Sequence, residues 1–173
     1  SIRGFVDNSE HRQALPPIYN YLSYVQSNIP GEDFMPIIQP LFTTGFLSYH
    51  FLKQSNFFDA KQVILTSASS KTALGLAYFL NQNQADDGLQ IIGLTSQRNI
   101  DFVKGTGFYD SVNSYEDVTK ELSKSPAVMV DFVGNAELAK TIDGYLVDDL
   151  KFISRIGLTN WKSGDGFNDI PKA

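Results

Sequence analysis

The stretch with the clearest capacity for chemistry is TSASSKTALG, residues 66–75, which joins an apolar run to a helical pattern. Such a junction can hold a phosphate, because backbone N–H groups and the helix dipole favour an anion there. One interpretation is an NTPase P-loop, G-x-x-x-x-G-K-[ST]. Lys71 and Thr72 fit that pattern, but Leu65 and Ser70 stand where its two glycines belong. The missing glycines weigh against it, because they let the loop wrap a phosphate.

Two other interpretations fit the same residues. In a dinucleotide-binding loop the three small positions would be Ser67, Ser70 and Ala73, and Ala73 would let helix and strand pack closely. Serine hydroxyls and backbone N–H groups would hold the pyrophosphate, and Lys71 would add a positive charge. Alternatively, the segment is only a turn with serine caps. Spacing alone does not separate these two interpretations.

The end of the second predicted strand favours a cofactor with a 2′-phosphate. NAD sites place a carboxylate there to bind the ribose 2′-hydroxyl, whereas residues 94–99 read LTSQRN without one. Ser96 and Arg98 would instead donate hydrogen bonds to a 2′-phosphate. The competing interpretation is that Ser96 caps a helix and Arg98 is solvated. We therefore predict NADP(H) as the cofactor.

Three further features have plainer interpretations. Tyr49 and Lys53 form the Y-x-x-x-K pair of short-chain dehydrogenases, but they precede the first strand, so we expect a helix surface. Residues 16–19, PPIY, match a WW-domain ligand, and four-residue matches arise easily by chance. For Asp131, a ribose contact and a turn-forming role both remain open.

A regular alternation of apolar strands and helices surrounds these residues. Continuous apolar strands indicate a parallel sheet that is covered on both faces. We predict an α/β fold, a doubly wound, Rossmann-like parallel sheet of five strands in the order 3-2-1-4-5. The expected strands are 63–66, 89–95, 109–112, 127–132 and 150–156, and the expected helices are 72–83, 98–105, 115–123 and 136–146.

The chain is expected to have three parts: an irregular segment 1–34, the nucleotide-binding domain 35–160 and a polar tail 161–173. No sixth strand is readable, so we expect a piece of a longer protein. Pro36 and Pro40 should break the start of the first helix, leaving it at 43–54. Leu47, His50 and Phe51 then have the spacing of a core-facing stripe.

The composition excludes several classes of protein. The 173 residues carry a net charge of −5, which argues against nucleic-acid binding. The absence of cysteine excludes disulfides and thiolate metal sites, and two distant histidines make a zinc site improbable. No apolar stretch reaches the ~20 residues that span a bilayer. We expect a cytoplasmic protein with no membrane or metal partner.

Several motifs resemble the nucleotide-binding domain of the medium-chain dehydrogenase/reductase superfamily, over residues 40–160. TTGF at 43–46 resembles the helix start that borders the nicotinamide, and TSASSKTALG stands where zinc-free, quinone-reductase-like members have Gly-Ala-x-Gly-Gly-Val-Gly. GTGFYDSVNSY at 105–115 and VDFVGN at 130–135 are similar to later motifs of the same members. The superfamily's GroES-like catalytic domain has no counterpart here, so we expect the chain alone to be inactive.

A second resemblance, to the DUF2855 family, spans nearly the whole chain. It is carried in order by HRQALPPIYN, SASSKTA, GLTSQRN, YD and VDFVGN. The serine-for-glycine loop is the pattern of that branch.

These resemblances imply an NADP(H)-binding domain that transfers hydride to a carbonyl or quinone-like small molecule in the full-length protein. The alternative is a non-catalytic nucleotide-sensing or interaction module of the same fold. A homodimer through the open edge of the last strand is also expected. The predicted cofactor-binding residues are Thr44, Ser67, Ser69, Ser70, Lys71, Thr72, Thr95, Ser96, Arg98, Asn99, Tyr115, Val133 and Gly134, with Tyr115 at the 2′-phosphate end and Thr44, Val133 and Gly134 at the nicotinamide end; no catalytic residue is assigned.

Overall fold

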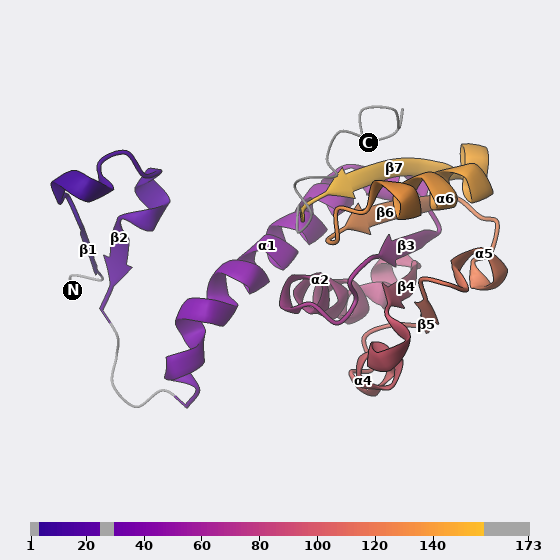
Figure 1. Ribbon diagram of the computed structural model, residues 1–173, viewed down its shortest axis with the longest axis horizontal. Helices are drawn as coiled ribbons and strands as arrows, with labels where there is room; N and C mark the ends of the chain where they lie inside the picture. Colours follow the sequence, from indigo (N-terminus) through magenta and orange to yellow (C-terminus); the bar gives the residue numbers. More distant parts are fainter. Residues whose placement is uncertain (1–3, 25–29, 158–173) are drawn as a thin grey trace. The chain divides into compact units, whose positions relative to one another are not determined.

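The computed structural model describes residues 4–24 and 30–157 (Figure 1). The chain forms two compact units, Ser1–Pro36 and Ile37–Ala173. The expected polar tail 161–173 and Trp161 within it lie outside the described residues.

The first unit has more regular structure than the irregular segment we expected. Strands β1 (Gly4–Val6) and β2 (Tyr21–Ser23) pair antiparallel. Arg12 lies between them in sequence, and its guanidinium contacts Asp7, Asn20 and the carbonyl of Tyr19. Short 3₁₀ helices complete the unit: η1 (Glu10–Arg12), η2 (Pro17–Tyr19) and η3 (Glu32–Phe34).

The second unit contains the predicted five-stranded parallel sheet. Its strand order is β5-β4-β3-β6-β7, which confirms the expected 3-2-1-4-5 arrangement. All four strand pairs are parallel. The strands are β3 (Gln62–Leu65), β4 (Gln90–Thr95), β5 (Ser111–Ser114), β6 (Ala127–Asp131) and β7 (Leu150–Arg155).

Strand β5 begins two residues later than predicted, because the residues before it have other roles. The carboxylate of Asp110 accepts a hydrogen bond from the backbone N–H of Ile91 at 2.7 Å. Its own N–H donates to the carbonyl of Ile91. Tyr109, the residue before it, directs its side chain across β4, as described below. Both residues therefore anchor β5 before its ladder with β4 begins.

Helices connect the strands, with shorter 3₁₀ segments at several junctions. The α-helices are α1 (Met35–Gln54), α2 (Lys71–Gln82), α3 (Gln84–Asp87), α4 (Ile100–Gly105), α5 (Val118–Glu121) and α6 (Ala136–Leu146). The 3₁₀ segments are η4 (Asn56–Asp59), η5 (Gln97–Asn99) and η6 (Val147–Asp149).

Helix α1 corrects two expectations. It begins at Met35 rather than at residue 43 and contains Pro40. Pro36 stands in its first turn, where a missing N–H costs no intrahelical bond. The residues of α1 buried in the core are Gly45, Tyr49 and Leu52, whereas the predicted core residues Leu47, His50 and Phe51 are exposed.

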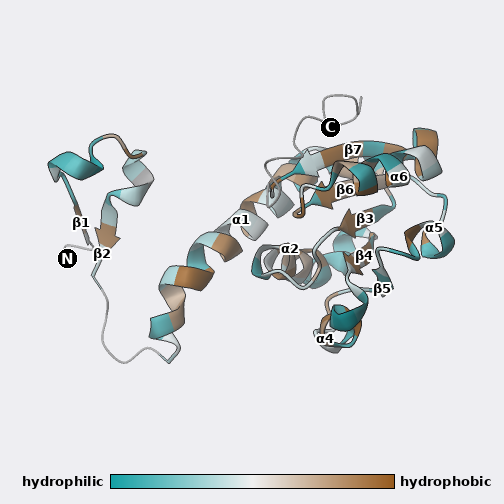
Figure 2. Cartoon of the chain, in the orientation of Figure 1, coloured by the Kyte–Doolittle hydropathy of each residue, from teal (hydrophilic) through white to brown (hydrophobic). Residues whose placement is uncertain are grey.

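Helices α1 and α2 approach each other backbone to backbone. A Cβ on Gly45 would lie 2.6 Å from the backbone nitrogen of Leu76 and 2.8 Å from the carbonyl carbon of Gly75. Two glycines thus let the helix backbones touch, which brings the buried stripe of α1 onto the same core as α2. Figure 2 shows apolar residues along α1 as well as in the sheet.

The core has one apolar layer on each face of the sheet. Tyr49, Leu52, Leu76 and Leu80 pack against one face, with Val63 among the strand residues. On the other face, Val118 of α5, Leu122 just after it, and Ala139 and Ile142 of α6 pack with Ile64 and Met129 of the strands. None of the helices in the described ranges has the length and apolarity to cross a membrane.

Candidate functional site

The loop between β3 and α2 has the backbone geometry of a glycine loop without its glycines. Ser67, the first of the three predicted small positions, has a φ of 49°, in the left-handed region that favours glycine. Ser70 caps α2, since its hydroxyl accepts from the N–H of Ala73. The capped-turn interpretation is therefore correct as local structure, and it does not exclude ligand binding by the same loop.

Two tyrosines on either side of β5 hold this loop. The Tyr109 hydroxyl donates to the carbonyl of Ala68 at 2.9 Å, and the Tyr115 hydroxyl accepts from the N–H of Ser67 at 3.0 Å. Gly93 lets the Tyr109 ring cross β4, because a Cβ there would lie 2.9 Å from the ring. We call Tyr109 and Tyr115 the tyrosine clamp. Sequence analysis missed Tyr109; its spacing to Tyr115 across a short strand was the available signal.

Burial raises the pKa of both clamp phenols. Burial is the only cause of the raised pKa of Tyr109. For Tyr115, burial is the largest cause, the hydrogen bond from Ser67 opposes it, and the negative charges of Asp131 and Glu116 add to it. Both phenols therefore stay protonated at neutral pH and act as neutral hydrogen-bonding groups.

Ser69 is tied to the end of β4. Its hydroxyl accepts from the side-chain amide of Asn99 at 3.1 Å and lies 3.5 Å from the hydroxyl of Thr95. Thr95 is only 1% exposed. The side chains of Thr95 and Asn99 therefore hold Ser69 in place, and their polar groups are used for that contact rather than being open to a ligand.

Three backbone N–H groups of the loop remain open. Within the described residues, those of Ser69, Lys71 and Thr72 donate to no protein acceptor. Lys71 and Thr72 begin the twelve-residue helix α2. The first N–H groups of a helix are unpaired by geometry and attract anions. The loop thus presents a concentrated set of donors.

The end of β4 supplies two further polar groups. Ser96 stands at the N-cap position of η5, yet its hydroxyl makes no capping bond. Arg98 is exposed and forms no ion pair within the described part of the chain. The predicted alternative, in which Ser96 caps the helix, is therefore wrong for its side chain. Both groups remain available to a ligand.

Asp131 has a structural role at the end of β6. It is fully buried, and its carboxylate accepts from the hydroxyl of Thr66 at 2.7 Å and from the N–H groups of Val133 and Gly134 at 3.0 and 3.1 Å. Gly134 has a φ of 73°. Of the two open interpretations of Asp131, the structure supports the turn-forming one.

The P-loop interpretation fails on the same geometry. Leu65, at the position of its first glycine, is the last residue of β3 and is fully buried. Asp131, at the position of a metal-binding carboxylate, has both oxygens occupied by the protein. Among the described residues, no group of three or more His, Cys, Asp or Glu side chains could hold a metal ion.

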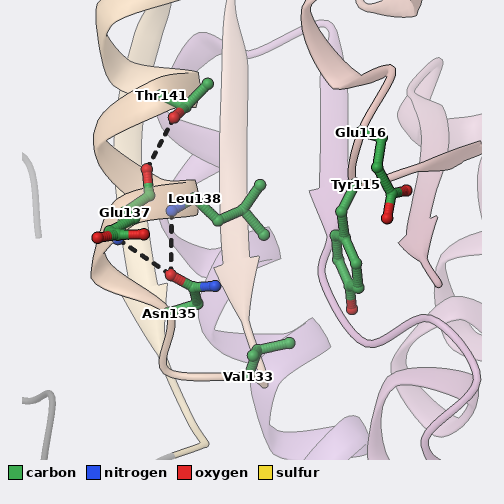
Figure 3. A pocket seen from close by; sticks show the side chains of 7 residues that line it. All are labelled: Tyr115, Glu116, Val133, Asn135, Glu137, Leu138 and Thr141. Carbon is green, nitrogen blue, oxygen red and sulfur yellow. Dashed lines mark hydrogen bonds between the residues drawn. The ribbon is translucent and has the colours of Figure 1, made fainter.

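A cavity of about 270 Å³ opens beside the clamp, between Tyr115 and the start of α6 (Figure 3). Val133 lies at one end of it, and Asn135 caps α6 by accepting from the N–H groups of Glu137 and Leu138. We expected Tyr115 and Val133 at opposite ends of a cofactor, but they line one cavity. The difference arises because Tyr115 reaches back to the loop after β3.

Two further predictions concern residues of α1, namely Thr44 and the pair formed by Tyr49 and Lys53. Thr44 lies on α1 beside Gly45, and its hydroxyl donates to the carbonyl of Pro40. Tyr49 donates to Asp87 at 2.9 Å and accepts from Lys53 at 3.0 Å, so this pair joins α1 to α3. Burial is the largest cause of the raised pKa of Tyr49; the hydrogen bond from Lys53 opposes it, and the contact with Asp87 adds to it. The expected helix surface is wrong for Tyr49, which is 3% exposed and packs in the core, whereas Lys53 is exposed. The pair has a structural role, because it joins α1 to α3.

The family model described as "protein of unknown function (DUF2855)" matches residues 1–172 of the chain. The chain belongs to the DUF2855 family. No curated protein matches this DUF2855 chain.

Solved structures resemble the DUF2855 chain at low sequence identity. A quinone oxidoreductase from Coxiella burnetii is 14% identical over 72% of this chain and 44% of its own, with a TM-score of 0.42. A proposed NADPH:quinone reductase from Mesorhizobium loti is 12% identical over 88% and 44%, with a TM-score of 0.49. The human synaptic vesicle membrane protein VAT-1 homolog-like protein is 13% identical over 87% and 49%, with a TM-score of 0.44. The DUF2855 chain spans less than half of each of these chains.

Proposed function

We propose that this DUF2855 chain binds NADP(H), with the pyrophosphate on the loop between β3 and α2. The observation that carries the proposal is the loop itself. A left-handed Ser67 and the open N–H groups of Ser69, Lys71 and Thr72 meet at the start of α2. Backbone donors at a helix start are suited to a diphosphate. The hydroxyls of Ser67, Ser69, Ser70 and Thr72 and the ammonium of Lys71 would complete the site.

Selection of NADP(H) over NAD(H) would rest on the end of β4. The open hydroxyl of Ser96 and the solvated guanidinium of Arg98 would bind the 2′-phosphate. Residues 94–99 contain no carboxylate to repel it. The carboxylates of Glu116 and Glu137 line the cavity beside α6 instead. That cavity would suit an uncharged part of the ligand rather than a phosphate.

In the full-length protein we propose hydride transfer to a carbonyl or quinone-like substrate. The bound cofactor supplies the hydride chemistry, and the protein holds and orients it. Thr44, Val133 and Gly134 would border its nicotinamide side, and Tyr115 would contact it through the cavity that it shares with Val133. Catalytic residues and the proton donor are left unassigned.

The test is a calorimetric titration of the full-length protein with NADPH and with NADH. We expect NADPH to bind more tightly. Arg98→Ala should weaken NADPH by about 1.5–3 kcal/mol, as for a charged hydrogen bond, and leave NADH nearly unchanged. Lys104→Ala, which removes an exposed cation from the last turn of α4, is the matched control and should alter neither titration.

Each unfavourable result has a specific meaning. If neither nucleotide binds at millimolar concentration, the reductase proposal fails. Equal affinities would show that Ser96 and Arg98 do not recognise a 2′-phosphate. NADPH binding without turnover of any carbonyl or quinone substrate would favour the nucleotide-sensing module. An interaction role through PPIY has less support, because Pro17–Tyr19 forms a 3₁₀ helix rather than the extended ligand that WW domains bind.

A further inference from the structure

A second site is an apolar groove between α1 and α2, with a volume of about 260 Å³. The α2 side chains Leu74 and Tyr78 that line it are not among the residues of that helix buried in the core. Phe108, from the segment before β5, closes it. The walls are formed by Ile38, Phe42, Leu74, Gly75, Tyr78 and Phe108.

Backbone contacts fix the walls of this groove. The crossing of α1 and α2 is set by Gly45 against Leu76 and Gly75, with no side chain between them. Gly75 forms part of the lining, and a Cβ there would lie 3.4 Å from Phe42. The groove is therefore preformed, because the two helix backbones already touch and cannot move closer together to close it.

The groove exposes large apolar side chains to water. Ile38, Phe42 and Tyr78 are 38%, 40% and 37% exposed. The Phe42 and Tyr78 rings lie 5.9 Å apart, and Tyr78 and Phe108 lie 5.7 Å apart in an edge-on contact. A contiguous exposed apolar patch of this kind marks a binding surface more often than an isolated exposed residue does.

One charged residue lines the groove, and it determines the ligand's chemistry. Lys71 is exposed, and its ammonium has no partner within the described residues. The other lining residues are uncharged. We propose that the groove binds a small amphiphile with an anionic head, a carboxylate, at Lys71 and a short acyl or aryl body over Phe42 and Tyr78. The volume is below the roughly 300–1,000 Å³ of drug-sized sites, so the body must be short.

This inference goes beyond the proposed function and does not depend on it. The cofactor loop uses backbone N–H groups and Arg98, and Arg98 does not line the groove. Lys71 is the one residue common to the two proposals. Failure of one can therefore be separated from failure of the other by variants that touch a single site.

The experiment titrates the isotopically labelled full chain with octanoate and with naphthoate, followed by amide chemical shifts. Octanol and octyltrimethylammonium are titrated in the same way, as a neutral and a cationic ligand for comparison with octanoate. We expect saturable binding of both carboxylates, with shifts centred on Phe42, Leu74 and Tyr78. Affinity should rise by about fourfold for each methylene added up to octanoate. Octanol should bind about three- to fivefold more weakly, as for an exposed ion pair, and the cation more weakly still.

Variants locate the head and body of the ligand. Tyr78→Ala should weaken octanoate by roughly fivefold through lost apolar contact. Lys71→Gln should remove the preference for octanoate over octanol. Leu47→Ala removes an exposed apolar side chain of α1 outside the groove and should change nothing. Arg98→Ala should leave octanoate unchanged while it weakens NADPH.

Three results would overturn the proposal. One is the absence of saturable binding by either carboxylate at millimolar concentration. Another is equal affinity for the octyl carboxylate and the octyl ammonium. The third is a concentration-dependent dimer in sedimentation that Tyr78→Ala dissociates, since the groove would then be an interface between copies of the chain.

Discussion

Ser67 has a backbone conformation that its side chain disfavours. Its φ of 49° lies where residues other than glycine are strained. Serine is small, and the hydrogen bond from its N–H to Tyr115 holds the conformation in place. Glycine would fit without strain, whereas a β-branched residue would be opposed by its Cβ substituents.

We therefore expect different effects on stability from two substitutions at this residue. Ser67→Gly should leave the free energy of unfolding within about 1 kcal/mol of the parent protein, because relief of strain offsets the added freedom of the unfolded chain. Ser67→Val should destabilise by about 1–2 kcal/mol. Urea unfolding measures both. Equal destabilisation by glycine and valine would show that the hydroxyl, not the backbone, determines the stability here.

The buried phenol of Tyr109 predicts a dependence on alkaline pH. Its folded-state pKa lies above the ordinary value of 10.0, so above about pH 10 the unfolded chain loses this proton while the native chain keeps it. The native state then binds more protons, and stability falls as the pH rises. Tyr109→Phe should make that fall less steep, while costing about 1 kcal/mol near neutrality for the lost bond to Ala68.

Urea unfolding at several pH values between about 8 and 11 tests this linkage. Tyr145→Phe is the matched control for the neutral-pH cost, because the Tyr145 hydroxyl also donates to a backbone carbonyl, that of Leu122. A Tyr109→Phe variant with the parent's full alkaline slope would contradict the assigned cause.

Among the elements, the crossing of α1 and α2 has little tolerance for added volume. Gly45→Ala would place a Cβ 2.6 Å from a backbone nitrogen, which cannot move as a side chain can. We expect a loss of about 1–3 kcal/mol or more, as for overpacking. Gly144→Ala in α6 meets nothing within 4 Å and should stabilise by about 0.5–1 kcal/mol. Thermal unfolding compares the two; similar values for both would rule out the close crossing.

The elements also show what the sequence could and could not predict. Apolar runs identified β3, β4 and β6 because these strands are buried in the middle of the sheet. The edge strands β5 and β7 are less apolar, and their place in the alternation of strands and helices identified them. The buried face of α1 was predicted wrongly because this helix carries apolar residues on all of its sides. Two glycines at the contact with α2, rather than the largest side chains, determine which face packs inward. The start of β5 was shifted because Tyr109 and Asp110 are as strand-compatible in sequence as the residues that follow, and only tertiary hydrogen bonds assign them elsewhere.

The candidate site was predicted as a set of residue types, and its internal connections were not. Serines in place of glycines pointed to the loop, and the missing carboxylate pointed to the end of β4. The contacts of Asn99 and Thr95 with Ser69 depend on the register between β3 and β4. The spacing of these residues along the sequence does not encode that register. Likewise, the position of Tyr115 beside Val133 follows from a long-range bond to Ser67.

For the whole molecule, the last strand suggests self-association. Within the described residues, β7 pairs with β6 on one side only and forms an edge of the sheet. An open edge can pair with another chain, so we propose a homodimer through β7. Light scattering during gel filtration should give twice the monomer mass at tens of micromolar. A single monomer mass across the concentration range would contradict it.

The tyrosine clamp has a consequence for how a ligand would arrive. Because the peptide groups of Ser67 and Ala68 are already held by Tyr115 and Tyr109, the loop has its shape before binding. An incoming phosphate would lose little affinity to ordering it. Association would then be governed by diffusion and the shedding of water rather than by a slow folding step. The amide proton of Ser67, which donates to Tyr115, would also exchange slowly with deuterium in the ligand-free protein, as would that of Ala68, which donates to the carbonyl of Leu94. Such protection is usually expected of a core strand rather than of a binding loop.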